Sequence, residues 1–239
     1  MADIIDITRG GLHDQVTQRL RTLLVEGRIA PGAKLNEREL CELLKVSRTP
    51  LREAIKRLAA EGLVDLLPNR GAVAVKLTTA DVEHAFEVLA ALEGLSGELA
   101  ATRASDAGIA EIQALHYEMR ACHARRDLSG YYRLNAQIHA AINAAAGNPV
   151  LMQTFTAMNA RVQSLRFRTN QDAAKWQRAV LEHEQMVQAL SARDGAALRQ
   201  VLVQHLQHKR DAVLQLMAAG TAYQAAEKPA RPARNRTSA

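Results

Sequence analysis

The stretch that decides the fold covers residues 34–64, KLNERELCELLKVSRTPLREAIKRLAAEGLV, and it predicts two short helices joined by a tight turn. Asn36, with Glu39 three residues later, has the spacing of a capping box at the start of the first helix. Ser47 is placed to cap the second helix. Pro50 falls in the first turn of that helix, where its missing N–H removes no helical hydrogen bond. This order of elements is typical of a helix-turn-helix.

The second of these helices has an apolar face and a basic edge. The apolar face consists of residues at helical spacing, namely Leu51, Ala54, Ile55 and Leu58. Arg48, Thr49 and Arg52 lie near the beginning of the helix and face outward. In a helix-turn-helix, that segment enters the DNA major groove, where arginine can donate two parallel hydrogen bonds to guanine. A basic stripe alone is also typical of a solvated face on an ordinary helical hairpin.

Two short strands are predicted directly after the second helix, over residues 63–67 and 72–75. Between them, Pro68-Asn69-Arg70-Gly71 makes a hairpin with a basic residue and a glycine at its tip. Gly71 would let the backbone approach a sugar-phosphate edge, and Arg70 is placed to enter the minor groove. A hairpin of this kind is a wing, and it favours a protein that reads duplex DNA.

The segment NERELCELLKVSRTPLREAIKRLAAEGLV, followed by a P-x-R-G wing, resembles the winged-helix domain of the GntR family of bacterial transcription regulators. The resemblance covers about residues 12 to 76 and is greatest to the FadR branch of the family. In that branch, the E-R-E-L arginine, two arginines early in the recognition helix and the wing glycine contact the operator. The resemblance therefore implies that Arg38, Arg48, Arg52 and Gly71 contact DNA.

Charge is unevenly distributed along the 239 residues, whose net charge is +6. Residues 1–78 hold 13 Lys and Arg against 10 Asp and Glu, whereas residues 79–220 hold 14 of each. A basic N-terminal part suits nucleic acid, and an aromatic share of 3% argues against single-strand binding by base stacking. Because no apolar run is long enough to span a membrane, we expect a cytoplasmic protein with no membrane partner.

The chain is expected to have five segments. We expect a mobile arm over residues 1–11, a winged-helix DNA-binding domain over 12–76 and a linker over 77–79. An all-helical effector-binding domain follows over 80–218, and a disordered basic tail over 219–239. Six helices are predicted in the effector-binding domain, over residues 80–103, 106–126, 128–146, 148–170, 172–192 and 194–218. The predicted fold is mainly α: a winged helix-turn-helix with three helices and a β-hairpin wing, then an antiparallel bundle of about six helices.

Histidines recur in the predicted bundle at positions that can meet. Asn135 and His139 lie four residues apart and share a helix face. His183 and His205 lie about ten and eleven residues on either side of a turn, so they come level in an antiparallel hairpin. Three imidazoles and one amide oxygen would form a transition-metal site with open positions. His208 is an alternative to His205, and ordinary half-buried histidines remain the competing interpretation.

Residues 80–218 resemble the FCD ligand-binding domain found in many FadR-branch regulators. The resemblance rests on the segments N-A-Q-I-H, L-E-H-E and Q-H-L. It implies that Asn135, His139, His183 and His205 bind a divalent transition metal, with zinc or nickel expected, and that a small organic acid completes the coordination. Asn135 replaces the commoner aspartate, which removes one negative charge from the metal ligands.

A second departure from the FCD pattern concerns the residue that holds the effector. Leu89 stands where many members have an arginine that contacts the effector carboxylate. Arg161, in the predicted helix over residues 148–170, is our candidate for a substitute. Arg161 and Arg168 are equally consistent with surface residues whose stems cover apolar side chains.

These features predict a homodimeric, metabolite-responsive transcription regulator, a repressor rather than an enzyme. Its partners would be double-stranded operator DNA and a small organic acid effector. One alternative is a metal-sensing regulator with no organic effector. This alternative is favoured because Leu89 stands where many family members have the carboxylate-binding arginine. A metal-dependent hydrolase is a further alternative, but no carboxylate base is identifiable near the histidines.

Overall fold

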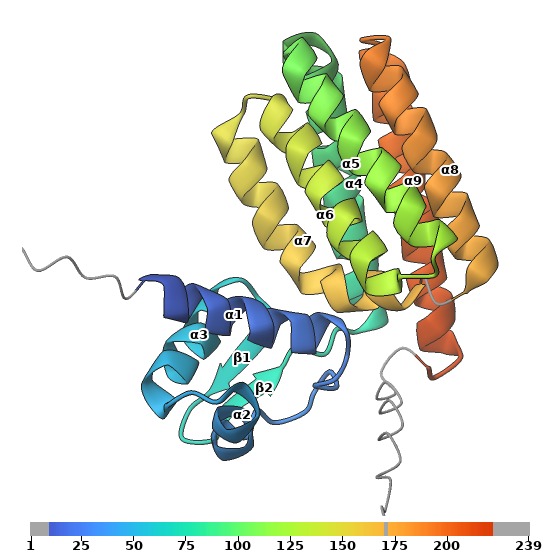
Figure 1. Ribbon diagram of the computed structural model, residues 1–239. Helices are drawn as coiled ribbons and strands as arrows, with labels where there is room; N and C mark the ends of the chain where they lie inside the picture. Colours follow the sequence, from blue (N-terminus) through green and yellow to red (C-terminus); the bar gives the residue numbers. More distant parts are fainter. Residues whose placement is uncertain (1–9, 170–171, 222–239) are drawn as a thin grey trace, which may run out of the picture.

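The computed structural model describes residues 10–169 and 172–221, and these form a winged helix next to a helical bundle (Figure 1). The first helix, α1, spans Gly10–Val25, so residues 10 and 11 are helical rather than part of the expected arm. The rest of that arm and most of the expected basic tail lie outside the described residues.

The helix-turn-helix consists of α2 (Glu37–Leu44) and α3 (Arg48–Ala60). Asn36 caps α2 as predicted, because its side chain accepts hydrogen bonds from the backbone N–H groups of Arg38 and Glu39. Lys45 then turns the chain with a left-handed φ of 56°. Ser47 is the N-cap residue of α3, but its hydroxyl makes no capping hydrogen bond. The apolar face of α3 is buried as predicted.

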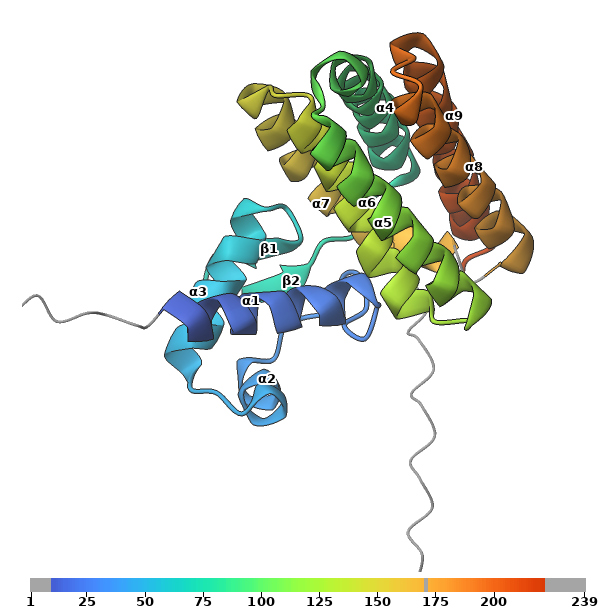
Figure 2. The same ribbon diagram turned by 45° about the horizontal axis from the view of Figure 1, so that its top comes forward.

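The wing is a two-stranded antiparallel sheet of β1 (Val64–Leu67) and β2 (Gly71–Ala74), with Val64 opposite Ala74 and Leu67 opposite Gly71. The turn between the strands has left-handed φ angles at Asn69 (57°) and Gly71 (86°). In both views, α2 lies on the side of the winged helix away from the bundle, so the helix-turn-helix is open to a partner (Figures 1 and 2).

The bundle is formed by the helices from α4 to α9. These are α4 (Thr79–Arg103), α5 (Asp106–Ala124), α6 (Leu128–Ala145), α7 (Pro149–Thr169), α8 (Ala173–Ser191) and α9 (Gly195–Ala218). As expected for short loops, α5 packs on α6 and α8 packs on α9. The first helix departs from strictly sequential packing, because α4 lies mainly along α9. A Cβ atom on Gly97 would come within 2.5 Å of Leu202, so glycine is required for this close approach.

One bundle helix, α7, also packs against the winged helix. Its Ala160 belongs to the apolar core of the winged helix, and its Phe167 clusters with Val25 of α1 and Tyr132 of α6. Ser129, at the start of α6, donates a hydrogen bond of 3.1 Å to Glu26, just after α1. The two domains therefore share apolar and polar contacts, and α7 provides most of the junction.

Candidate metal centre and DNA-binding surface

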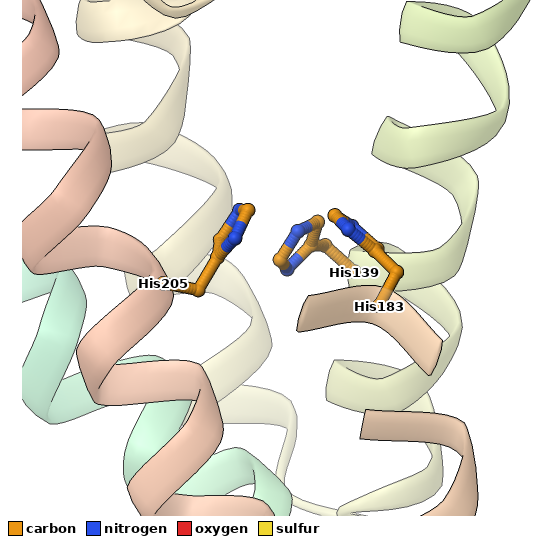
Figure 3. Close-up of side chains that lie close together, drawn as sticks. All are labelled: His139, His183 and His205. Carbon is orange, nitrogen blue, oxygen red and sulfur yellow. The ribbon is translucent and has the colours of Figure 1, made fainter. Parts of the chain in front are cut away.

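His139, His183 and His205 come together in the interior of the bundle, each from a different helix (Figure 3). Their ring centroids are 4.9 to 5.4 Å apart, and one ligand atom from each ring lies within 4.8 Å of the others. All three side chains are buried. The spacing argument that placed His183 and His205 at the same level is consistent with this arrangement.

Two of the three rings are oriented by a partner at Nδ1. His183 donates from Nδ1 to the backbone carbonyl of Ala179 at 2.6 Å, and His205 donates from Nδ1 to Glu182 Oε2 at 2.5 Å. In both rings Nε2 is buried and has no hydrogen-bond partner among the described residues. Donation from Nδ1 leaves the lone pair on Nε2, which is the arrangement that a metal-binding histidine requires.

His139 completes the group from α6. Its Nε2 is also buried and lacks a hydrogen-bond partner among residues 10–169 and 172–221. Its Nδ1 lies 2.6 Å from Oε2 of Glu93, although the two atoms are not aligned as a hydrogen bond. Three unsatisfied imidazole nitrogens in one small volume are costly unless a ligand satisfies them, and a cation is the ligand that suits them.

Burial also sets the charge of these rings. Loss of solvent lowers the pKa of His183 and of His205 well below its usual value, and the neighbouring imidazoles lower it further. Both rings are therefore neutral at physiological pH. Neutral imidazole is the form that binds transition metals, so the residues present fit such an ion.

Asn135 and His208 have different places relative to this cluster. Asn135 is buried on α6, one turn before His139 and on the same face. His208 is 46% exposed, and its Nδ1 donates to Glu182 Oε1 at 2.6 Å. Of the two alternatives on α9, the structure therefore places His205, not His208, with the other rings.

Three charged residues of this centre were not identified by the sequence analysis. Glu93 and Arg166 are buried beside His139, with Arg166 Nη1 3.9 Å from Glu93 Oε1, and Glu182 bridges His205 and His208. Glu93 had a usable signal, since it is a lone acid within the otherwise small and apolar stretch VLAALEGLSG. Glu182 directly precedes a candidate ligand in the L-E-H-E segment, but sequence alone does not show where its carboxylate points.

The structure places Arg161, the residue predicted to hold the effector, at the junction with the winged helix. Arg161 packs over Gly62 of the winged helix, where an added Cβ atom would come within 2.9 Å of its Cγ. Arg168 likewise lies against Gly27 and donates to the carbonyl of Thr221 at 3.4 Å. Both arginines contact the domain junction because the face of α7 that carries them turns toward the winged helix. Arg166 is the arginine of α7 that enters the bundle.

The predicted DNA-contacting residues lie on α2, on α3 and in the wing. All of them are exposed: Arg38, Arg48, Thr49, Arg52, Arg70 and Gly71. Arg52 donates to Glu37 at 2.9 Å and Arg38 to Glu42 at 3.3 Å. In the described part of the chain, Arg48 and Thr49 have no side-chain partner. Arg48 is thus already free to donate at the start of α3, whereas Arg52 must first leave Glu37.

Comparison with known proteins matches both parts of the chain. Residues 84–208 match the family model described as "FCD domain", and residues 12–73 match "Bacterial regulatory proteins, gntR family". The chain belongs to the GntR family and carries an FCD domain. The family resemblance proposed from the sequence is confirmed.

Two curated relatives of this GntR protein are regulators. It is 27% identical over 205 residues to the HTH-type transcriptional repressor RspR of Escherichia coli K12, covering 86% of this chain and 90% of that protein. It is 30% identical over 196 residues to the Nta operon transcriptional regulator of Aminobacter aminovorans, covering 78% and 87%. Among solved structures, E. coli McbR/YncC shares the fold, with a TM-score of 0.77 at 22% identity over 86% of this chain and 98% of that one.

These matches show that the GntR protein is a transcription regulator and not an enzyme, so the hydrolase alternative is wrong. The mainly α fold with a winged helix and a helical second domain is also confirmed. Among the described residues, no helix is both long and apolar enough to cross a membrane.

Proposed function

We propose that this GntR regulator is a homodimeric repressor whose FCD domain holds a divalent transition metal and senses a small carboxylate. The observation that carries the proposal is a set of three buried imidazoles, each of which brings one ring nitrogen within 4.8 Å of the others. The Nε2 atoms of all three rings have no hydrogen-bond partner among the described residues. Imidazole donors favour zinc, nickel or copper over magnesium and calcium, which prefer oxygen. Three protein nitrogens leave at least one coordination position for another ligand.

The metal ligands would be His139, His183 and His205, with Asn135 as an oxygen donor on the same face as His139. Ala179 and Glu182 support the proposal because each fixes one imidazole through Nδ1. Such partners hold the ring orientation and raise the basicity of the ligand atom. When bound, the metal would supply a Lewis-acidic position for a carboxylate oxygen.

Arg166 is the residue best placed to hold an effector carboxylate. Its side chain is buried beside Glu93, and its Nη1 donates to Asn159 Oδ1 at 2.5 Å. Leu89 is fully buried and carries no charge, so it contributes only apolar packing. We therefore assign the role first given to Arg161 to Arg166, whose planar guanidinium suits bidentate carboxylate recognition.

Operator binding would use the start of α3 together with the wing. Arg48 and Arg52 would reach base edges in the major groove, with Thr49 and Arg38 on phosphates. Arg70 and Gly71 would meet the sugar-phosphate edge or the minor groove. Two copies of the chain would place two such surfaces on the half-sites of one operator.

Coupling between the domains would run through α7. Arg166 lies beside the proposed effector position, and Arg168, two residues later, packs on Gly27 of the winged helix. An effector that prefers one position of α7 would change the population of winged-helix orientations by its difference in affinity for the two states. A shift of α7 on effector binding would therefore be passed to α1 through the contact of Arg168 with Gly27.

The proposal is tested by metal content and effector binding in the full chain. We expect native mass spectrometry of dimeric protein to show up to one zinc or nickel ion per chain, and we expect His205→Ala to lose it. His84→Ala is the matched control, because His84 is an exposed histidine on α4. Failure of metal-depleted wild-type protein to take up zinc or nickel would refute the metal centre.

A metal sensor without an organic effector is the second candidate, favoured by the leucine at position 89. The two candidates differ in one measurement, namely operator affinity of metal-loaded protein with and without added small carboxylates. An effector-responsive regulator changes affinity on addition of the acid. A pure metal sensor responds only when the metal is removed.

A further inference from the structure

A polar cavity lies between the end of α7, α8 and α9. Its volume is about 160 Å³. The residues that matter most in its wall are polar or charged: Thr169, Lys175, Arg178, Glu182, His208 and Lys209. Neither the sequence motifs nor the proposed metal centre accounts for this cavity.

Lys209 is the unusual member of the cavity wall because it is a buried cation. Only 5% of the residue is exposed, and its Nζ lies 3.4 Å from Thr169 Oγ1. Burial lowers the pKa of Lys209 to about 7. Charge-assisted hydrogen bonds from a buried cation to an anion are strong, so a cavity lined by Lys209 suits an anionic ligand.

The charges around the cavity favour an anion. Lys175, Arg178 and Lys209 are basic, and each lines the space. Glu182 is acidic, but both of its oxygens already accept hydrogen bonds, from His205 and His208. The second acid in the wall, Asp211, is paired with Arg210 at 2.8 Å. The basic groups therefore outnumber the acids, and both acids already have partners.

The cavity and the histidine centre share two residues. Ala179 and Glu182, which line the cavity, are the partners of His183 and His205 at Nδ1. The Nε2 atoms of both rings are left for the proposed metal. A molecule in the cavity would therefore contact the groups that orient the rings and would leave the metal's open position free.

We propose that this cavity is a second binding site, for a small anion with phosphate or carboxylate oxygens, separate from the effector position at the metal. Lys209 holds the anion from the floor of the cavity, and Arg178 and Lys175 hold it from the rim. A cavity of about 150 Å³ accommodates a molecule of benzene size, so inorganic phosphate or a four-carbon dicarboxylate matches the available volume.

Binding at this site would reach the metal centre through Glu182. An anion close to His208 competes with Glu182 for the Nδ1–H of that histidine, and this alters the position of the carboxylate that orients His205. The anion site itself does not depend on the proposed metal function, whereas this coupling does. By linkage, any effect of the anion on metal affinity equals the effect of the metal on anion affinity.

The test uses isothermal titration calorimetry of the metal-free full chain with inorganic phosphate and, separately, with succinate. We expect saturable binding of at least one of them, at about one site per chain. Lys209→Met should weaken that binding by about ten- to a hundredfold, because a hydrogen bond between charged partners is lost. Arg178→Ala, a change at an exposed rim residue, should weaken binding without affecting folding.

Controls separate this site from the metal centre. Arg199→Met changes a cation of the same helix that pairs with Glu98 away from the cavity, and it should bind the anion as wild type does. His139→Ala should lose zinc binding and keep anion binding in the metal-free protein. Binding of neither anion, or equal binding by wild type and the folded Arg178→Ala and Lys209→Met variants, would overturn the proposal. Failure of the wild-type protein to bind zinc, with anion binding retained, would overturn only the metal centre.

Discussion

Glu182→Gln is the substitution that most directly tests how the histidine centre is built. Glu182 accepts one hydrogen bond at each carboxylate oxygen, from His205 at 2.5 Å and from His208 at 2.6 Å. Glutamine has nearly the same shape but only one acceptor oxygen, and its NH₂ group would face one of the two Nδ1–H donors. The variant therefore keeps the volume of the side chain and removes its charge and one acceptor.

The expected loss of metal affinity follows from these two bonds. A hydrogen bond to a charged group contributes about 1.5–3 kcal/mol, against about 0.5–1.5 kcal/mol for a neutral one. Exchanging one for the other at His205 costs about 1–1.5 kcal/mol, or roughly five- to twelvefold in affinity. If His205 faces the NH₂ group instead, the loss approaches the upper end of the tenfold to hundredfold range typical of outer partners of metal ligands.

The assay is competition for zinc between the protein and a chromophoric chelator, at a pH where His183 and His205 are neutral. Glu184→Gln is the matched control, because Glu184 lies two residues later on α8 and pairs instead with His116 and Arg120. We expect Glu184→Gln to bind zinc within about twofold of wild type, well below the loss of at least about fivefold derived above for Glu182→Gln. Wild-type zinc affinity in folded Glu182→Gln would refute the assignment of Glu182 as the residue that orients His205.

Three further changes test other parts of the molecule. Arg48→Ala should weaken operator binding by about 1–3 kcal/mol in a fluorescence anisotropy titration. Arg57→Ala, at the other end of α3, is the control. Equal losses of operator affinity in the two variants would contradict base reading by Arg48. Lys209→Met should stabilise the protein most at or below pH 7, by up to about 4–5 kcal/mol, as judged by urea unfolding. Between the folded pKa of Lys209, about 7, and its usual value of 10.5, the unfolded chain binds more protons than the folded one. Wild type therefore gains stability as pH rises through that window, and the difference in unfolding free energy between Lys209→Met and wild type should shrink. A pH-independent difference would argue against a buried charged lysine. Gly27→Ala should destabilise the domain junction by about 1 kcal/mol or more, because φ is +71° and the new Cβ would meet the Arg168 guanidinium; an unchanged melting temperature would show that this junction is not formed in solution.

The winged helix was predictable because its signals are local. A cap at Asn36, a proline in the first turn of α3 and a glycine in the wing each act over three or four residues, and these positions recur in the structure. The meeting of His183 and His205 was predictable for a related reason. Two helices joined by a short turn have only one register, so residues equally far from the turn come level.

The charged residues around the centre depend on contacts between helices that are distant in sequence. Glu93 meets His139 because α4 also packs on α6, a pairing that no short loop dictates. The positions of the α7 arginines could not be predicted for a related reason. Its arginines at 161, 166 and 168 look alike in a helical pattern that assumes one buried face.

That assumption does not hold for α7, because the helix is covered on two sides. Its Ala160 and Arg161 face the winged helix, while Arg166 faces Glu93 inside the bundle. Residues two apart on a helix point about 200° away from each other, so Arg166 and Arg168 necessarily contact opposite partners. A helix with a charged residue buried on each side cannot rotate or slide without disturbing both contacts. The two-sided burial of α7, which the sequence did not reveal, is therefore the feature through which the proposed effector would act on the DNA-binding domain.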